Sequence, residues 1–417
     1  MKVHLYGNTL NNAYNLTIFL RAKGIDAEMF LDNASPFSQD FPWWEDPTLS
    51  PENLPDWIHY YPVRSFFLFP SRTLRRMIQD FSKCDIALVC GFGPIVAMKA
   101  KVPFVFYSIG SDLNSLHLKE ELLSLVKGKA PLKGKFMRLV KILTYTPLQF
   151  KALKKVANRI IVLMGYQVNP YINGLGLAHK TVKGLLAYDI EKYDVPVDKS
   201  LYKNYQQYDI VFFMISRHMW KELYADFKGN DKFINAFAKF VKEYKPNVKL
   251  ILIRKGTDYK ASEKLVNSHG IEDYVEWIDM INKDGIRAYL SLPNCVVVDQ
   301  FWHDEWYKRY PSDKARPKIG FGGGSIEAMA ARRPLITVFF DEAFYENSMP
   351  PVLYAFKTEE IYQRIVQVYK MTPEEKDQMG ENGRQFVYKW HAWYNAIDVY
   401  INTLKKVLAE VENNHNI

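Results

Sequence analysis

Three consecutive glycines and a serine stand where the sequence predicts the start of a helix. Residues 320–334 read GFGGGSIEAMAARRP, with good helix formers from Ser325 onward. Glycine allows positive φ and close approach of a ligand to the backbone, and the first N–H groups of a helix lack intrahelical partners and bind anions. We expect Glu327, in the first helical turn, to accept hydrogen bonds from sugar hydroxyls. The expected anion site consists of Gly322, Gly323, Gly324 and Ser325.

A phosphate joined to a ribose would satisfy both the helix start and Glu327, and two cations in a second loop favour a diphosphate. Arg217 follows the predicted strand DIVFFMIS at 209–216, and Lys228 comes eleven residues later, just before a predicted helix. Two cations at the carboxyl edge of a sheet would neutralise a diphosphate and stabilise it as a leaving group without a metal ion. The alternatives are a tight glycine loop in which Glu327 only complements the helix dipole, and two surface cations that flank a loop.

Strands and helices alternate along the chain, which predicts parallel sheets with right-handed crossovers. Residues 41–62, rich in proline and tryptophan, are interpreted as an irregular excursion. In the N-terminal half we expect strands at 3–6, 27–31, 85–90, 103–110 and 160–164, and helices at 12–23 and 91–100. In the C-terminal half we expect strands at 209–216, 248–256, 274–278, 294–301 and 334–340, and helices at 231–244, from Thr372, and at 391–411.

The length of 417 residues fits two α/β domains of roughly 200 residues each. A polar stretch with little periodicity separates the two series of strands. Each domain is expected to be a doubly wound sheet, and ligands of such sheets bind at the carboxyl ends of the strands, here in the cleft between domains. The expected boundaries are 1–188 for the N-terminal domain, 189–208 for a linker, 209–390 for the C-terminal domain and 391–417 for a final helix.

The sequence predicts a cytoplasmic protein without a membrane span or metal site. Its apolar runs are far shorter than the ~20 residues that cross a bilayer. The N-terminal MKVHLYGNTL begins directly with a strand pattern and shows no signal peptide. The three cysteines, Cys84, Cys90 and Cys295, have neither disulfide-framework nor zinc-site spacing.

The net charge of +9 is concentrated in one stretch of the N-terminal half. Residues 122–188 contain twelve Lys or Arg and no Asp or Glu, so the remainder of the chain is slightly acidic. Between 127 and 159 apolar residues lie among the cations, which suits an anionic membrane surface carrying a lipid-linked glycan acceptor. A solvated basic face is an equal alternative. We do not expect nucleic acid as a partner, since no recognised binding module accompanies the charge.

Four segments together resemble the glycosyltransferases of the GT-B fold, in particular the large retaining family 4 (glycosyl transferases group 1). They are the glycine turn GNTLNN at 7–12, YSIGSDL at 107–113, Arg217 with Lys228-Gly229, and IGFGGGSIEAMA at 319–330. The resemblance covers nearly the whole chain. It implies two Rossmann-like domains that face each other across a cleft, with the C-terminal helix returning to the N-terminal domain.

The resemblance also implies roles for individual residues. Arg217 and Lys228 would be catalytic, gripping the donor diphosphate as it leaves, and Glu327 would hold the ribose hydroxyls. Backbone N–H groups of the glycine turn would bind the phosphates, the nucleobase would lie near 277–280, and Asp112 would contact the acceptor or the sugar. Asp112 is alternatively a helix N-cap. The turn at Gly7 and Asn8 would close over the donor from the other domain.

The implied reaction is retaining, metal-independent transfer of a sugar from a UDP- or GDP-type donor to a hydroxyl acceptor. The acceptor would be a glycan or a lipid-linked glycan, as in polysaccharide biosynthesis, and no further cofactor is implied. One departure bears on activity, because Ile319 stands where the family pattern has its first glutamate. A non-catalytic nucleotide-sugar-binding protein of the same fold, or a nucleotide-sugar epimerase, therefore stays as an alternative.

Overall fold

The computed structural model divides into two compact units, residues 1–187 with 393–417 and residues 188–392. Each unit is an α/β domain built on a parallel sheet, which confirms the predicted fold class. No helix among the residues described below is long and apolar enough to cross a bilayer. The structure describes residues 1–32, 35, 38–62, 71–108, 132–156, 159–163, 174–221, 228–301, 321–338 and 342–415.

The first unit contains a seven-stranded sheet in the order β3-β2-β1-β4-β5-β6-β7. The central strands are buried at nearly every position, as expected when helices cover both faces of a parallel sheet. The order of strands reverses between β1 and β4, so the turn after β1 lies at a topological switch point. The strands are β1 (Lys2–Tyr6), β2 (Asp26–Asp32), β3 (Ile58–Tyr61), β4 (Ile86–Val89), β5 (Phe104–Ser108), β6 (Arg159–Leu163) and β7 (Thr181–Gly184).

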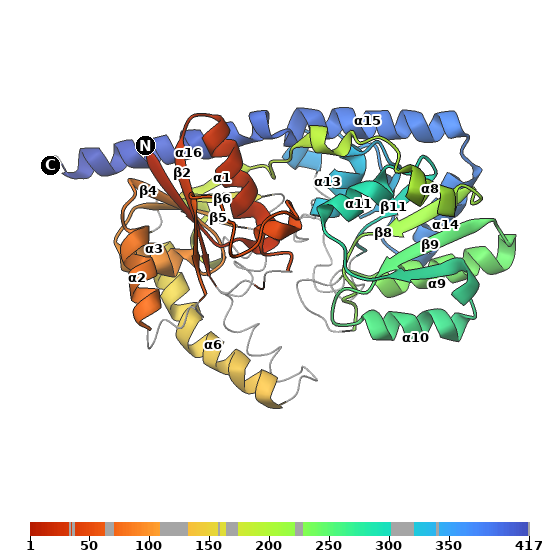
Figure 1. Ribbon diagram of the computed structural model, residues 1–417, viewed down its shortest axis with the longest axis horizontal. Coiled ribbons are helices and arrows are strands. Elements are labelled where there is room, and N and C mark those ends of the chain that lie inside the picture. The colour runs from red at the N-terminus through yellow and green to blue at the C-terminus, as the bar shows by residue number, and fades with distance from the viewer. Residues whose placement is uncertain are drawn as a thin grey trace. The chain divides into compact units, whose positions relative to one another are not determined.

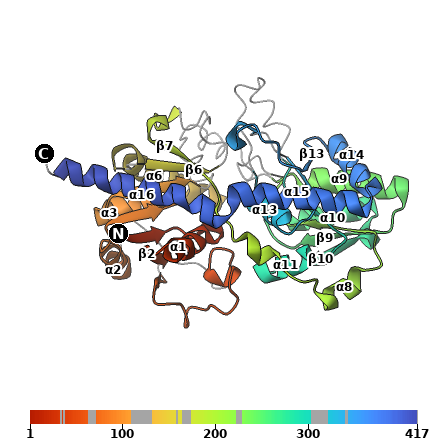
Figure 2. The ribbon, with the colours of Figure 1, turned by 90° about the horizontal axis from the view of Figure 1, so that it is seen from above.

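Helices of the first unit pack on both faces of its sheet (Figure 1). The helices α1 (Asn12–Ala22) and α16 (Trp393–His415) share one apolar core with the sheet, and Figure 2 shows α16 passing over the strands beside α1. The helices α2 (Arg72–Phe81), α3 (Gly93–Ala100) and α6 (Leu132–Lys151) pack in a second core.

The second unit contains a six-stranded parallel sheet in the order β10-β9-β8-β11-β12-β13, which reverses between β8 and β11. The strands are β8 (Ile210–Met214), β9 (Val248–Ile253), β10 (Val275–Ile278), β11 (Cys295–Val298), β12 (Leu335–Thr337) and β13 (Leu353–Tyr354). The helices are α8 (Lys199–Tyr205), α9 (Asn230–Tyr244), α10 (Tyr259–His269), α11 (Lys283–Leu290), α13 (Gly323–Ala330), α14 (Thr358–Lys370) and α15 (Pro373–His391).

Two packing arrangements cover the second sheet. The helices α9, α10 and α14 contribute to a single apolar core with the strands, whereas α13 packs against α15 (Figure 1). The capping box predicted at Thr372 is confirmed, since Thr372 Oγ1 accepts a hydrogen bond from Glu375 N–H and the Glu375 carboxylate accepts from Thr372 N–H.

Two expectations about local structure were wrong. Residues 41–62 are not wholly irregular, because they contain the edge strand β3, which pairs only with β2 in the described sheet. Its neighbouring prolines and tryptophans obscure the strand pattern. Residues 189–208 are also not a plain linker. They include α8 and a short helical turn at Ile190–Tyr193, and they belong to the second unit.

Candidate functional site

The carboxyl ends of β8 and β11 lie side by side at the switch point of the second unit. Their register pairs Met214 with Val298, so the segments that leave the two strands start next to each other. Arg217 is the third residue after β8 and is half-buried. Ligands of doubly wound sheets bind at such points, so the predicted cation lies where a ligand is expected.

Lys228 lies at the same edge of the sheet and is held there by hydrogen bonds of its backbone and side chain. Its backbone N–H donates to Met219 O at 2.7 Å, and its carbonyl accepts from Phe301 N–H at 2.7 Å. Its ammonium donates to Gln300 Oε1 at 2.7 Å. Gly229 follows with φ of +64°, and a Cβ there would lie 1.6 Å from Phe301 O. The backbone after β11 therefore fixes Lys228, and only glycine fits beside it.

The loop between Arg217 and Lys228 is anchored at its start. His218 N–H donates to Lys255 O at 2.7 Å, and Trp220 N–H donates to Asp258 Oδ2 at 2.7 Å. The His218 ring is fully buried, with Nδ1 2.9 Å from Ser262 Oγ. Burial lowers the pKa of His218 to about 4, so the ring is neutral at physiological pH.

A buried carboxyl group lies beneath the glycine turn. Asp299 is 5% exposed and accepts a hydrogen bond from Ser325 Oγ at 2.5 Å. Burial raises the pKa of Asp299, while hydrogen bonds from Ser325 and the charge of Lys228 act in the opposite direction. A Cβ on Gly322 would lie 3.0 Å from Asp299 Oδ2. Gln300 thus fixes Lys228, and the adjacent Asp299 fixes the start of α13.

The helix α13 begins at Gly323 rather than near Ser325, with Gly322 as its N-cap. The prediction that Glu327 lies in the first turn was therefore wrong, because the helix starts two residues earlier than its composition suggests. Gly323 and Gly324 are the first two residues of the helix, so their N–H groups have no intrahelical partners. The Ser325 hydroxyl donates to Asp299.

Glu327 is 1% exposed and forms an ion pair with Lys283, the first residue of α11. Sequence reasoning missed Lys283, Asp299 and Gln300. The signal for the last two was their position directly after the buried strand CVVV, at the edge where ligands bind. No comparable signal marks Lys283.

The predicted turn at Gly7 and Asn8 is closed by its own hydrogen bonds. The Gly7 carbonyl accepts from Cys90 Sγ at 2.7 Å and Tyr107 Oη at 3.1 Å. Asn8 Oδ1 accepts from Tyr14 N–H, and Asn8 Nδ2 donates to Asn11 Oδ1 and Asp40 O, at 2.8 to 2.9 Å. To contact the nucleotide-sugar donor, the Asn8 side chain would have to give up these hydrogen bonds. Asp112 and Ile319 lie outside the described residues.

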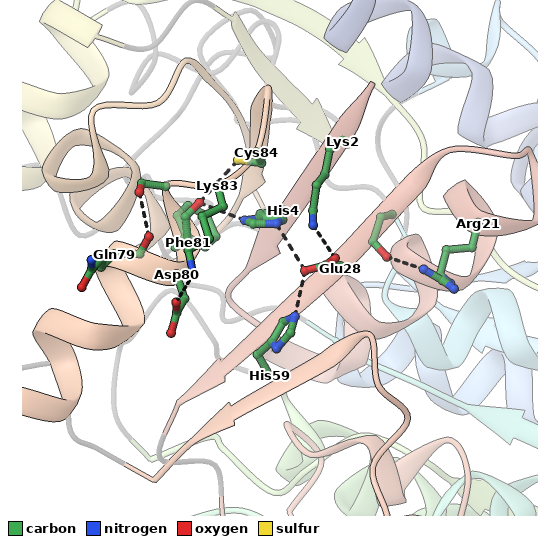
Figure 3. A network of polar contacts seen from close by, with 12 residues as sticks. Lys2, His4, Arg21, Glu28, His59, Gln79, Asp80, Phe81, Lys83 and Cys84 are labelled. Carbon is green, nitrogen blue, oxygen red and sulfur yellow. Dashed lines mark hydrogen bonds and ion pairs between the residues drawn. The ribbon is translucent and has the colours of Figure 1, made fainter.

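A second polar cluster lies near the amino ends of β1, β2 and β3 in the first unit (Figure 3). The Glu28 carboxylate accepts from Lys2 Nζ at 2.6 Å and from His59 Nε2 at 2.8 Å. Burial raises the pKa of Glu28, but the hydrogen bonds from Lys2 and His59 outweigh it and hold the pKa below its usual value. This cluster joins three strands away from the edge where ligands bind.

Residues 221–386 match the family model Glycosyl transferases group 1. No curated protein matches the chain.

Three solved structures resemble nearly the whole chain in structure, and at their low identities this likeness shows the fold alone. Alr3699/HepE from Anabaena, in complex with UDP and glucose, is 16% identical, with TM-score 0.66 and coverage of 97% of this chain and 100% of its own. Sucrose-phosphate synthase from Thermosynechococcus elongatus is 15% identical, with TM-score 0.62 and coverage of 99% and 100%. WaaG, a glycosyltransferase involved in lipopolysaccharide biosynthesis, is 12% identical, with TM-score 0.60 and coverage of 96% and 99%. Together, the comparisons show that residues 221–386 match the group 1 glycosyltransferase model and that nearly the whole chain has the GT-B fold of these structures.

Proposed function

We propose that the chain is a retaining, metal-independent glycosyltransferase with Arg217 and Lys228 as its catalytic cations. The donor is a UDP- or GDP-sugar, with UDP favoured because Anabaena HepE is similar in fold and was solved with UDP. One observation carries the proposal. At the switch point of the second unit, Gln300 holds the Lys228 ammonium and adjacent Asp299 holds the start of the glycine-rich helix α13.

The proposed chemistry is electrostatic. The bond between the anomeric carbon and the diphosphate oxygen breaks, and the acceptor hydroxyl bonds to that carbon from the same face. The hydroxyl proton passes to an oxygen of the leaving diphosphate, so no protein base is needed. Arg217, Lys228 and the N–H groups of Gly323 and Gly324 stabilise the departing charge, each well-placed donor contributing about 3 kcal/mol. Glu327 accepts hydrogen bonds from the ribose.

Nucleotide binding is the first test. UDP, GDP, ADP and CMP, each at about 100 times its dissociation constant, would stabilise the fold by about 2.7 kcal/mol if they bound. We expect one series to raise the melting temperature of the wild type and to lose this effect in Lys228→Ala. If no series shifts the wild-type melting temperature, the donor site is wrong.

Product analysis tests the reaction itself. With the donor that binds and a panel of glycan acceptors, NMR of the product should show the anomeric configuration of the donor, and the rate should survive EDTA. Inversion of configuration, or loss of activity in EDTA with recovery on adding Mg²⁺, would overturn the corresponding part of the proposal. Donor binding without turnover on any acceptor would instead indicate a non-catalytic nucleotide-sugar-binding protein.

We propose that the first unit, which would bind the acceptor, contacts a membrane surface through helix α6. Helix α6 exposes Phe136 and Leu143, each 63% exposed, and Pro147. Their spacing of seven and four residues places them on one face of the helix. The helix lies within the basic stretch 127–159 and reaches beyond the sheet of its unit (Figure 1). We infer peripheral contact with anionic lipid and a lipid-linked glycan acceptor from this amphipathic surface.

Sedimentation with vesicles tests this contact. Phosphatidylglycerol vesicles should retain the wild type at low salt, and phosphatidylcholine vesicles should not. Phe136→Ser with Leu143→Ser should weaken retention about tenfold. Met349→Ser, which removes another exposed apolar side chain in the second unit, should not. Equal retention of all three proteins would contradict the proposed surface.

A further inference from the structure

Lys283 and Glu327 form a charged pair in the interior of the second unit. Lys283 is 8% exposed and Glu327 is 1% exposed. Lys283 opens α11 directly after its N-cap Asn282, whose side chain accepts from Gly285 N–H at 3.1 Å. Glu327 lies on α13, among buried apolar neighbours of the same helix. The pair therefore joins the start of one helix to the interior of the other.

The stability of the fold does not require this ion pair. Taking two charges out of water is expensive, and two apolar side chains of similar volume often give equal or greater stability. Lys232, another buried lysine of the same unit, is accommodated in a different way. Its ammonium donates to Phe356 O at 3.0 Å and lies over the Phe356 ring. Lys283 instead contacts the one side chain of α13 that is predicted to bind the donor.

The location of the contact connects it to the glycine turn. The ammonium meets Glu327 Oε1. The same oxygen lies 3.6 Å from the position that a Cβ on Gly323 would occupy. Gly323 is the first residue of α13, where phosphate is proposed to bind. The paired carboxylate thus lies beside the first residue of α13, as does the Tyr188 hydroxyl, whose oxygen is 2.5 Å from the same Cβ position.

The charge state of the Glu327 carboxyl group decides whether it only accepts hydrogen bonds from hydroxyl groups or also donates them. An ionised carboxylate only accepts hydrogen bonds, whereas a protonated one also donates. Hydroxyl groups of a ribose donate to a carboxylate acceptor. Burial favours the protonated form of a carboxyl, and a nearby cation favours the ionised form. A cation at Lys283 therefore keeps Glu327 in the form that a ribose needs.

We propose that Lys283 is a positioning residue of the donor site, which holds the Glu327 carboxylate ionised and oriented to accept the ribose hydroxyls. This inference rests on the proposed function, because Glu327 is assigned to the ribose there. It adds a specificity-determining residue from α11. Lys283 acts through Glu327, so its removal weakens recognition of the ribose hydroxyls and leaves contacts to the phosphates and the base in place.

Calorimetric titration with hydroxyl-deleted nucleotides tests the proposal. The probes are UDP and GDP with their 2′-deoxy and 3′-deoxy analogues. The wild type should bind the nucleotide about tenfold more tightly than at least one analogue. In Lys283→Met this preference should fall close to unity, through weaker binding of the parent nucleotide and nearly unchanged binding of the analogue. Lys232→Met is the matched control and should keep the preference.

A second variant covers the case in which Lys283→Met does not fold. Lys283→Gln keeps a hydrogen-bond donor and removes the charge. Its preference for the ribose hydroxyl should fall as pH is lowered, because a buried Glu327 without the neighbouring cation binds a proton more readily, whereas the wild-type preference should stay level. The ratio of two dissociation constants cancels the titration of the phosphate common to both ligands.

The outcomes separate the two proposals. If neither UDP nor GDP binds the wild type, the proposed function falls and this inference with it. If a nucleotide binds but the wild type does not distinguish the analogues, the donor site stands and the ribose role of Glu327 falls, together with that of Lys283. If Glu327→Gln loses the preference and both Lys283 variants keep it at every pH, only the inference about Lys283 is overturned.

Discussion

The first strand of each sheet ends in a turn at the switch point of that sheet, and the two turns are built differently. After β1, Gly7 and Asn8 are closed by neutral groups, including Cys90 and Tyr107. After β8, the corresponding segment carries Arg217 and leads to Lys228, with Asp299 and the start of α13 beside it. The first turn satisfies its polar groups internally, whereas the second gathers charge.

This difference supports the proposal that the turn after β8 binds the charged part of the substrate. Neutral groups that satisfy each other rigidify a turn and offer little to a diphosphate. Partly buried charges are costly for the fold and stabilise an anion that enters a site of low dielectric. We therefore expect changes in the turn after β1 to affect mainly stability, and changes in the turn after β8 to affect mainly catalysis.

The largest expected effect is that of Lys228→Ala on catalysis. Transfer should slow by about 100-fold or more, because one cation no longer stabilises the leaving diphosphate. Single-turnover rates measure this effect, and urea unfolding should show stability within about 0.5 kcal/mol of the wild type. Lys221→Ala, an exposed cation of the same loop, is the control and should leave the rate unchanged. An unchanged rate in Lys228→Ala would remove Lys228 from the mechanism.

The converse prediction concerns Asn8→Ala, which should lower the free energy of unfolding by about 3 kcal/mol. The substitution leaves Tyr14 N–H, Asn11 Oδ1 and the Asp40 carbonyl without their hydrogen bonds to Asn8, and an unsatisfied buried group costs about 1–3 kcal/mol. Asn8→Asp keeps the acceptor for Tyr14 N–H but turns a carboxylate oxygen toward the oxygens of Asn11 and Asp40, so it should lose at least as much. Urea unfolding distinguishes the three proteins. A loss below about 0.5 kcal/mol in Asn8→Ala would contradict the internally closed turn.

Acid should destabilise the turn after β8 through His218. The folded-state pKa of His218 is about 4, below the ordinary value of about 6.5. As pH falls below about 6.5 the unfolded state takes up the proton first, so stability is complete above that pH and is lost toward pH 4. The loss between pH 7 and pH 5 should be about 2 kcal/mol.

Urea unfolding at several pH values measures this loss, and His218→Gln should remove most of the pH dependence in that window. If His218→Gln keeps the full pH dependence, other groups carry it.

The sequence predicted the two parallel sheets because buried strands alternate with helices, and it predicted most strands within two residues. It missed β3, where prolines and tryptophans obscure a short edge strand, and it also missed the short strands β7 and β13. It also placed the start of α13 too late, because glycines disfavour helix, whereas Asp299 holds Ser325 in the first turn of α13. Lys283 and Gln300 lie 44 and 72 residues from the partners they hold, and no local pattern reveals contacts between segments so distant.

The smallest expected effect is that of Gln300→Leu. It tests whether the Lys228 ammonium must be held in a fixed position to support catalysis. Gln300 Oε1 accepts from the Lys228 ammonium at 2.7 Å. Without this acceptor the cation keeps its charge and loses its fixed position, so kcat/KM should fall about tenfold. Gln300→Glu should reduce the rate further, because a second negative charge faces the diphosphate. Gln207→Leu, an exposed glutamine of the same unit, is the control. Steady-state kinetics of the three variants decide the matter, since an unaffected Gln300→Leu would mean that Lys228 is placed by its backbone contacts to Met219 and Phe301 alone.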